Sequence, residues 1–345
     1  MTPQDKTPVF LLTGFLGSGK TTLLNAALRD PRLAHTAVVV NELGEIGLDN
    51  LIIAQAVDNV VLLDAGCLCC ANTGALHETL ADLAARRASG ALPPFERVII
   101  ETSGVADPAP LLNVLLGHPL VTGQYALEAV VCVADAQHYL QAREKYPELE
   151  KQAAVADRIV VSKSDLAEAE SVLSFLNELN PDAEILSSTV ASPAVAAFFD
   201  LGKALKAKIR ISGLGPLQRH GRPGGIRAFS FRPPPPVTWA GWSAWSRLVA
   251  AEFGARLIRV KGLLKMEDGP GNGGEIAFVQ GVQGVFHPPQ RFREWPDEDH
   301  GNRLVCIARD LRQADIEATL PALNTAAGTQ ATYSLRELQE RQAQQ

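Results

Sequence analysis

The stretch GFLGSGKTT, which begins at Gly14, constrains this chain more than any other part of its 345 residues. The apolar run VFLLT precedes it, and a segment of helical pattern, Lys20–Arg29, follows it. It fits the pattern G-x-x-x-x-G-K-[ST] at Gly14, Gly19, Lys20 and Thr21. That pattern requires a strand before it and a helix after it. The sequence therefore predicts a tight, glycine-rich turn between a first strand and a first helix.

Residues 1–205 alternate short apolar runs with helical segments, which is typical of a doubly wound, mostly parallel α/β domain. Several runs are almost continuously apolar, as strands buried on both faces are. The predicted strands are Val9–Thr13, Thr36–Asn41, Val60–Leu63, Val98–Thr102, Ala129–Ala134, Arg158–Ser162 and Glu184–Ser188. The predicted helices are Lys20–Arg29, Thr73–Arg87, Pro110–Leu116 and Ala167–Leu179.

The remainder of the chain has a different pattern. Residues 206–225 are punctuated by Gly and Pro without hydrophobic period, and we interpret them as a linker. Residues 226–325 contain clustered strand-like runs, with WAGWSAWSRLVAAEFG and RQADIEATLPALNTAA as predicted helices. Clustered strands favour a smaller C-terminal α+β domain with an antiparallel sheet. Residues 326–345 are a polar tail.

Composition narrows the classes of protein that this chain can be. The chain is 46% apolar and 20% charged with a net charge of −6, and it has no dense Lys/Arg block, so we expect no nucleic-acid partner. It has no signal-peptide pattern and no membrane-length apolar run, which predicts no membrane association. Five unevenly spaced cysteines favour a reducing cytoplasm. Cys132 and Cys306 lie in apolar runs and are predicted to be inert core residues.

The glycine-rich turn has the chemistry of a phosphate-binding loop. Its backbone N–H groups can surround phosphate oxygens, and the helix that follows adds partial positive charge. We expect Lys20 to bind the β- and γ-phosphates and Thr21 to ligate Mg²⁺. The predicted nucleotide contacts in this loop are Gly14, Phe15, Leu16, Gly17, Ser18, Gly19, Lys20, Thr21 and Thr22.

The base is predicted to be guanine because of SKSD, residues 162–165, which follows an apolar strand. The Asp165 carboxylate can accept hydrogen bonds from N1–H and the 2-amino group of guanine, a pair of donors that adenine lacks. The stem of Lys163 can lie along the purine face. SKSD alone would more often be a helix N-cap, so the prediction of GTP depends on the upstream loop. Backbone groups of Ser187, Ser188 and Thr189 are further candidates for contacting the base.

Two more predicted strands end in carboxylates. Asn41–Glu42 follows one strand, and Glu101 ends another, three residues before Gly104. A carboxylate there can hold Mg²⁺, usually through water, and the Gly104 N–H can sense the γ-phosphate. These two loops are therefore candidate switch segments that depend on GTP. Without the upstream loop, we would interpret both carboxylates as solvated strand ends.

The order GFLGSGKTT, NELGE, GCLCC, ETSGVADPAP and SKSD resembles the CobW-type GTPases, relatives of the urease and hydrogenase nickel-insertion GTPases. RVKGLL, VQGVQGVFHPP and WPDEDHGNRLVCIARDL resemble the smaller C-terminal domain of that family. The resemblance covers residues 8–320 and implies GTP hydrolysis coupled to delivery of a metal, commonly zinc, to a client protein. Many members carry a long His-rich loop. This chain has only seven histidines, which are not clustered, so metal storage is not expected.

The remaining cysteines, Cys67, Cys69 and Cys70, fall within GCLCC. Thiolates suit zinc, Cu(I) and Fe–S chemistry. With the resemblance, they are predicted to supply three ligands of a metal site. The fourth ligand is open, with Glu42, Glu45, His118 and His138 as candidates, although a lone loop histidine is more often simply solvated. A redox site is the alternative, but only Cys67 and Cys70 have C-x-x-C spacing and adjacent cysteines pair with strain.

The sequence thus predicts a GTP-hydrolysing metallochaperone that requires GTP, Mg²⁺ and a transition metal, with zinc preferred over cobalt, nickel or iron. The predicted catalytic residues are Lys20, Thr21, Glu42 and Glu101. The alternatives are a guanine-nucleotide switch with redox-sensing cysteines and a cobalt- or iron-insertion GTPase of the same family. A phosphotransferase acting on a small molecule is disfavoured by SKSD. The client protein is not identified by the sequence, and a homodimer is left open.

Overall fold

The computed structural model describes residues 6–40, 60–64, 73–187, 193–199, 225–268 and 274–326. The chain divides into two compact units, one of residues 1–177 and 182–210 and the other of residues 178–181 and 211–345. The predicted linker and tail lie outside the described residues except for Gly225 and Ala326. Among the described helices, none has the length and apolar character needed to cross a membrane.

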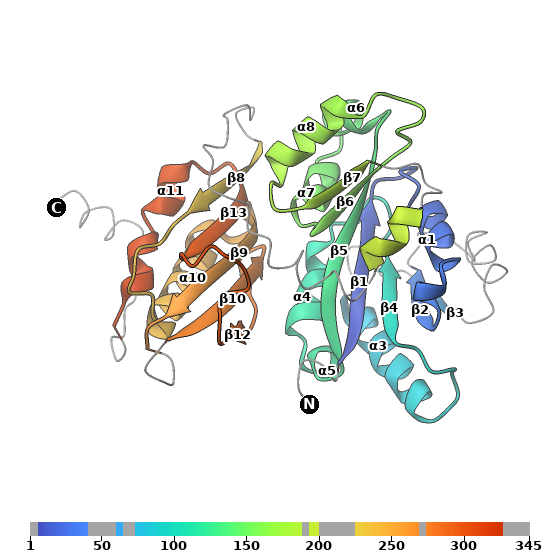
Figure 1. Cartoon of the computed structure of the whole chain (residues 1–345), viewed down its shortest axis with the longest axis horizontal. Coiled ribbons are helices and arrows are strands. Elements are labelled where there is room, and N and C mark those ends of the chain that lie inside the picture. The colour runs from blue at the N-terminus through green and yellow to red at the C-terminus, as the bar shows by residue number, and fades with distance from the viewer. Residues whose placement is uncertain are drawn as a thin grey trace. The chain divides into compact units, whose positions relative to one another are not determined.

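A seven-stranded sheet forms the centre of the first unit, in the order β3-β2-β4-β1-β5-β6-β7 (Figure 1). Every neighbouring pair is parallel. The strands are β1 Thr7–Gly14, β2 Thr36–Val40, β3 Val60–Asp64, β4 Arg97–Glu101, β5 Tyr125–Asp135, β6 Arg158–Ser162 and β7 Glu184–Ser187. The chain reverses its direction of strand addition at β1, and ligands of such sheets bind beyond the carboxyl ends at that point.

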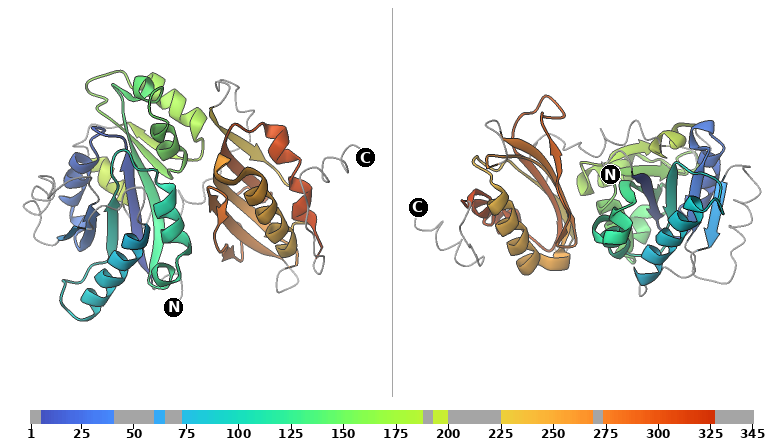
Figure 2. Two further views of the ribbon diagram at one scale, coloured as in Figure 1. Left: turned by 180° about the vertical axis from the view of Figure 1, so that it is seen from behind. Right: turned by 90° about the horizontal axis from the view of Figure 1, so that it is seen from below.

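Helices cover both faces of this sheet, which confirms the predicted doubly wound fold (Figure 2). One face packs against α1, Lys20–Leu28, and the short 3₁₀ helix η3, Pro193–Phe199, with Phe10, Val131 and Phe199 in its core. The other face is covered by α3, Thr73–Ala88, and α4, Ala109–Gly117. Because both faces are covered, the central strands can be apolar at every position.

Five further helical segments lie among the described residues between β1 and β7. They are η2 Pro31–Leu33, α5 Pro119–Thr122, α6 Tyr139–Ala142, α7 Glu148–Ala154 and α8 Glu170–Leu179. The prediction started the last of these at Ala167, but the structure starts it at Glu170, because a turn at residues 164–166, which includes the last two residues of SKSD, comes first. The sequence prediction contained neither α6 nor α7, and α7 turns out to contact the loop after β4.

The second unit is built on an antiparallel sheet in the order β11-β10-β9-β13-β8, with β12 paired to β10. Its strands are β8 Ile226–Phe231, β9 Leu257–Met266, β10 Glu275–Val282, β11 Val285–Phe286, β12 Gln290–Phe292 and β13 Arg303–Arg309. The helix α10, Trp239–Phe253, packs its buried side chains on one face of this sheet. The predicted smaller α+β domain with an antiparallel sheet is therefore confirmed.

The second predicted helix of this unit is wrong as a single element. Its residues form α11, Gln313–Glu317, and a separate 3₁₀ helix η5, Leu320–Asn324. Pro321 lies in the first turn of η5, where its missing N–H is tolerated, and it cannot continue the preceding helix. Thr319, between the two, accepts a hydrogen bond from Trp245 Nε1 at 2.8 Å.

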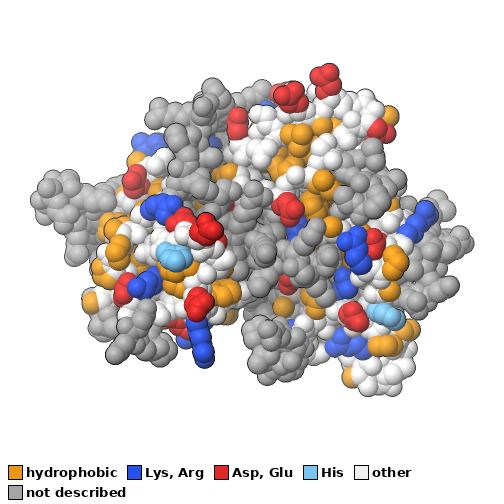
Figure 3. All heavy atoms as spheres, viewed as in Figure 1, with side chains coloured by type: hydrophobic (Ala, Val, Ile, Leu, Met, Phe, Trp, Pro, Cys, Tyr) orange, Lys and Arg blue, Asp and Glu red, His pale blue; other side chains and the backbone are white. Residues whose placement is uncertain are grey.

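Charged side chains of both signs are interspersed over the described part of the face shown in Figure 3.

The two buried thiols behave as predicted. Cys132 and Cys306 are 1% and 0% exposed. Burial raises the pKa of Cys132 to about 12 and raises the pKa of Cys306 further, so both thiols stay protonated near neutrality.

Candidate nucleotide-binding site

The loop between β1 and α1, residues 14–19, passes directly against β5. Gly14 has a φ of 142°, and a Cβ there would lie 2.4 Å from the carbonyl oxygen of Val133. Only glycine fits this position, because a side chain would meet backbone. Gly19 precedes the first helical residue and has no side chain to cap α1. The start of α1 therefore presents N–H groups and partial positive charge to an anion.

The Lys20 side chain bends back over the loop instead of extending to solvent. Its ammonium group donates to the carbonyl oxygens of Gly14 at 2.9 Å and Phe15 at 3.2 Å, and the residue is 8% exposed. Ser18, 1% exposed, carries a buried hydroxyl that has no hydrogen-bond partner among the described residues. A buried polar group is normally paired, so this loop fits a ligand that carries oxygen atoms.

The outer part of the loop is more open. The Phe15 ring packs against the ring of Tyr146, with centroids 4.8 Å apart. Leu16 is 61% exposed, and Gly17 and Thr22 are exposed as well. The inner half of the loop, around Lys20, is therefore the part with the preorganised polar groups.

Thr21 and Glu101 meet at the carboxyl ends of the adjacent strands β1 and β4. The Thr21 hydroxyl donates to Glu101 Oε1 at 2.7 Å, and Glu101 is 4% exposed. Thr102 Oγ1 and Thr13 Oγ1 lie 3.1 Å apart at the same ends. A hydroxyl and a carboxylate oxygen are hard ligands, the type that Mg²⁺ prefers, so these two residues fit a magnesium site.

The loop after β4, residues 102–108, lies against the phosphate loop. A Cβ on Gly104 would be 2.5 Å from the backbone nitrogen of Leu16, so the two backbones touch. The structure therefore brings Gly104 beside residues 14–19, the position in which it could contact a terminal phosphate.

SKSD lies at the end of β6 and is tied to the phosphate loop through its first residue. The fully buried Ser162 hydroxyl lies 2.7 Å from the carbonyl oxygen of Ser18 and 3.2 Å from that of Ala134. Lys163 has a φ of 57°, a strained backbone conformation for a side-chain-bearing residue. Asp165 is exposed beyond it. Ser187 is exposed at the end of β7, and Ser188 and Thr189 lie outside the described residues.

Asp135, which the sequence analysis missed, supports Lys163. Its Oδ2 lies 2.7 Å from Lys163 Nζ and 3.1 Å from His138 Nδ1, and its Oδ1 accepts from the Gln137 N–H at 2.8 Å. Burial alone raises the pKa of Asp135, but these hydrogen bonds outweigh it and lower the pKa below its ordinary value. The available signal was its position, since Asp135 ends the apolar run VVCVAD at the same edge of the sheet as Glu101.

The candidates for the fourth metal ligand fall into two groups. Glu42 and Glu45, like Cys67, Cys69 and Cys70, lie outside the described residues. His118 stacks on His77, with ring centroids 4.2 Å apart, and His138 lies against Asp135. Among the described residues, no three His, Cys, Asp or Glu side chains form a group that could hold a metal ion.

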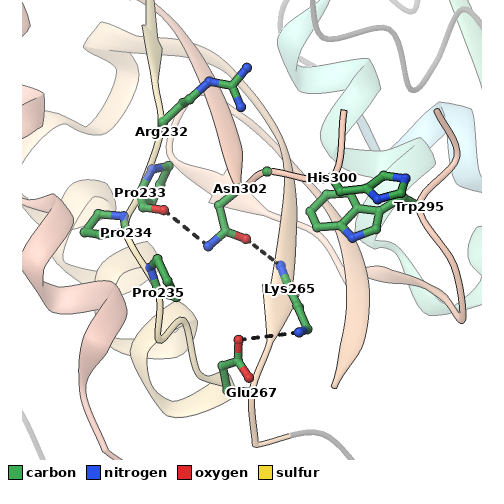
Figure 4. A pocket seen from close by; sticks show the side chains of 10 residues that line it. Arg232, Pro233, Pro234, Pro235, Lys265, Glu267, Trp295, His300 and Asn302 are labelled. Atoms are coloured by element: carbon green, nitrogen blue, oxygen red, sulfur yellow. Dashed lines mark hydrogen bonds and ion pairs between the residues drawn. The ribbon is translucent and has the colours of Figure 1, made fainter. Parts of the chain in front are cut away.

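A pocket of about 420 Å³ is lined by residues of the second unit (Figure 4). Asn302, one of its lining residues, accepts from the Lys265 N–H at 2.8 Å and donates to the Pro233 carbonyl at 3.2 Å. The two cationic side chains that line the pocket both lie near carboxylates. Arg232 binds Asp299, and Lys265 Nζ lies 3.9 Å from Glu267. This pocket has no glycine-rich loop followed by a helix, the arrangement that binds phosphate groups.

The chain matches two family models in sequence. Residues 8–187 match the CobW/HypB/UreG nucleotide-binding domain. Residues 226–324 match the cobalamin synthesis protein cobW C-terminal domain.

Similar proteins match nearly the whole of this chain. The chain is 29% identical over 322 residues to the zinc chaperone YjiA of Escherichia coli, covering 91% of this chain and 98% of that one. It is 29% identical over 353 residues to the zinc chaperone CobW of Pseudomonas aeruginosa, covering 90% of each chain. The crystal structure of the Zn(II)-bound YjiA GTPase matches with a TM-score of 0.69 at 26% identity, over 93% of this chain and 99% of that one.

The first match alone spans more than half of the chain, and the phosphate loop, Glu101 and SKSD all lie within it. This chain therefore belongs to the CobW/HypB/UreG family of nucleotide-binding proteins.

Proposed function

We propose that this protein is a GTP-hydrolysing metallochaperone that binds zinc at Cys67, Cys69, Cys70 and Glu42 and delivers it to a client protein in a GTP-dependent way. The chain is a GTPase by its family. Its relatives in Escherichia coli and Pseudomonas aeruginosa are named zinc chaperones, and a relative in Dictyostelium discoideum is named a zinc-regulated GTPase metalloprotein activator. These names support zinc as the metal and a metalloprotein as the client.

The observation that carries the proposal is the register of three neighbouring strands. Val40 at the end of β2 pairs with Asp64 at the end of β3 and with Glu101 at the end of β4. Since adjacent strands are about 4.8 Å apart, the backbones of Asp64 and Glu101, two strands apart, are separated by roughly 10 Å. The strand that leads to the cysteines therefore ends close to the carboxylate that contacts Thr21.

Chain length limits how far the proposed metal ligands can be from these strand ends. Glu42 follows Val40 by two residues, and Cys67 follows Asp64 by three residues. At about 3.5 Å per residue, the covalent chain keeps Cys67 within roughly 10 Å of Asp64 and Glu42 within roughly 7 Å of Val40. This reach supports a metal site next to the nucleotide, where each ligand can alter the affinity for the other.

The chemistry proposed for GTP uses residues that the structure brings together. Lys20, now hydrogen-bonded to two carbonyls of the loop, would bind the β- and γ-phosphates and stabilise charge on the transferring group. The N–H groups of residues 14–19 and of the start of α1 would hold the remaining oxygens. A water molecule would attack the γ-phosphate in line. Mg²⁺, when bound, would be held by Thr21 and Glu101 and would neutralise phosphate charge.

The proposal is tested by measuring zinc affinity with a competing chelator in three states of the reduced protein: with Mg²⁺ and a non-hydrolysable GTP analogue, with Mg²⁺ and GDP, and without nucleotide. We expect zinc affinity to differ at least 5-fold between the analogue and GDP states, the lower end of ordinary coupling. Cys67→Ser should lose most zinc affinity. Cys306→Ala, which removes a buried thiol of the second unit, is the matched control.

The outcomes separate the candidate functions. Equal zinc affinity in all three states, together with an unaffected Cys67→Ser, would exclude a nucleotide-coupled metal site. If zinc does not bind but oxidation of Cys67 and Cys70 changes GTP affinity, the redox switch replaces the metallochaperone. Transfer of the zinc to apo-metalloproteins of the same cell, accelerated by GTP, would establish delivery.

A further inference from the structure

Helix α7 contacts the loop that lies against the phosphate loop. Gln152, 1% exposed, donates from Nε2 to the carbonyl oxygens of Gly104 and Ala106, each at 3.1 Å. The neighbouring Lys151 contacts Asp107 Oδ2 at 2.8 Å. The loop is therefore held to one short helix at three residues, Gly104, Ala106 and Asp107.

These contacts act on a turn that is already closed by its own backbone. The Ala106 N–H donates to the carbonyl oxygen of Ser103 at 3.1 Å, so Gly104 is a central residue of the turn. Asp107 also accepts from the Ala109 N–H at 3.0 Å, which connects the loop to the start of α4. Since Gln152 holds the carbonyl before and the carbonyl after Val105, it fixes the orientation of the whole turn.

The side of the turn that faces away from these contacts packs against the phosphate loop. The backbone of Gly104 touches that of Leu16, where a Cβ would come within 2.5 Å. Gly104 is buried, yet its N–H donates to none of the described residues. Buried backbone N–H groups are nearly always paired, so this donor, beside a phosphate loop, fits a phosphate oxygen.

We infer that Gln152 is a positioning residue for recognition of the γ-phosphate: it holds the 102–108 loop so that the Gly104 N–H meets the terminal phosphate. This inference rests on the proposed role of Gly104 in GTP binding. Gln152 touches no phosphate itself. Two carbonyl oxygens need two hydrogens from one group, so a neutral amide satisfies both, whereas a carboxylate at the same position would repel them.

The test compares ligands that differ only in the terminal phosphate. Affinities for GDP and for a non-hydrolysable GTP analogue are measured with Mg²⁺ on wild type and Gln152→Leu, together with kcat and KM for GTP. We expect GDP affinity to stay within about 2-fold, while analogue affinity and kcat fall roughly 10- to 100-fold, the range for a lost hydrogen bond to a charged group. Gln141→Leu, an exposed glutamine on α6, is the matched control and should change neither.

A second variant keeps the test decisive if the first fails to fold. Lys151→Ala removes the partly exposed contact to Asp107 without placing an apolar side chain in the interior, and it should lower analogue affinity by a smaller factor, again without altering GDP affinity. Equal losses for GDP and the analogue, or no loss for either, would overturn the role of Gln152. If wild type hydrolyses GTP and couples it to zinc while Gln152→Leu and Lys151→Ala keep full analogue affinity, only this inference fails. If the wild-type protein does not bind the GTP analogue or hydrolyse GTP, the proposed function itself is contradicted, and the inference about Gln152 falls with it.

Discussion

Asp165, which we propose selects the base, is exposed at the end of SKSD. Asp165→Asn should weaken GTP binding by about 100-fold, because the neutral amide can accept only one of the two hydrogen bonds from guanine and places an NH2 donor against the other guanine donor. The same variant should gain affinity for xanthosine triphosphate, since an amide can donate to the 2-oxo group of xanthine. A competition assay with labelled GTP measures both.

The control for that substitution is Glu168→Gln, which removes a nearby exposed carboxylate outside SKSD. It should leave the ratio of GTP to xanthosine triphosphate affinity unchanged. Wild-type binding that does not distinguish GTP from ATP would contradict the proposed role of SKSD.

The buried thiols give a second prediction at this scale. In a variant with Cys67, Cys69 and Cys70 replaced by Ser, a thiol-reactive dye at pH 8 should label no cysteine of the native protein and two after unfolding. With its pKa at about 12, Cys132 is a thiolate in only about one molecule in 10⁴ at that pH, and its side chain is shielded. Rapid labelling of the native variant would show that the core opens around it.

Local pattern identified the residues that belong to motifs, such as Lys20, Thr21 and Asp165, because the chemistry of each motif fixes its spacing. Asp135 and Gln152 belong to no motif. Each acts on a segment that the fold brings near, Lys163 and the loop containing Gly104, from a position far along the chain. Such contacts depend on the order of strands in the sheet, which the sequence alone does not state.

At the scale of elements, the strands of the parallel sheet were predictable, whereas the short helices α6 and α7 were not. Strands β1, β5 and β6 are mostly buried, so their sequences carry a strong apolar signal that few polar residues, such as Glu128, interrupt. Helix α7 has seven residues, and a helix so short is stable only through its tertiary contacts. The three-residue β12 is likewise too short to carry a pattern of its own, whereas the division between α11 and η5 follows from Pro321.

The contact between α10 and the segment before η5 provides a test of such tertiary support. Trp245 Nε1 donates to Thr319 Oγ1 at 2.8 Å, and both residues are fully buried. Thr319→Val preserves the shape but leaves the indole N–H unpaired, which should cost about 1–3 kcal/mol of unfolding free energy. Thr319→Ser keeps the hydroxyl and should cost less. Urea unfolding followed by tryptophan fluorescence measures both, and equal costs would show that packing alone matters here.

At the scale of the whole molecule, all four tryptophans lie in the second unit, at positions 239, 242, 245 and 295. Tryptophan fluorescence therefore reports the unfolding of that unit alone, while circular dichroism reports both units. GDP with Mg²⁺ at 100 times its dissociation constant should stabilise the first unit by about 2.7 kcal/mol. That corresponds to a rise of roughly 5–10 °C in its Tm.

We therefore expect the circular dichroism transition to divide when the nucleotide is added, while the fluorescence transition stays in place. The control is ATP with Mg²⁺ at the same concentration, which should shift neither transition. A fluorescence transition that moves together with the first unit would instead show that the two units unfold as one.

The hydroxyl of Ser162 has a mechanical consequence for the first unit. Its single hydrogen lies within reach of the carbonyls of Ser18 and Ala134, so it ties the end of β6 that carries SKSD to the phosphate loop and to β5. On the other side of β1, the strands β4, β2 and β3 end side by side in register, and the segments bearing Glu42 and the three clustered cysteines follow β2 and β3 in the sequence. Under the proposed function, movement that follows loss of the γ-phosphate would therefore affect β4, β2 and β3 more than β5 and β6.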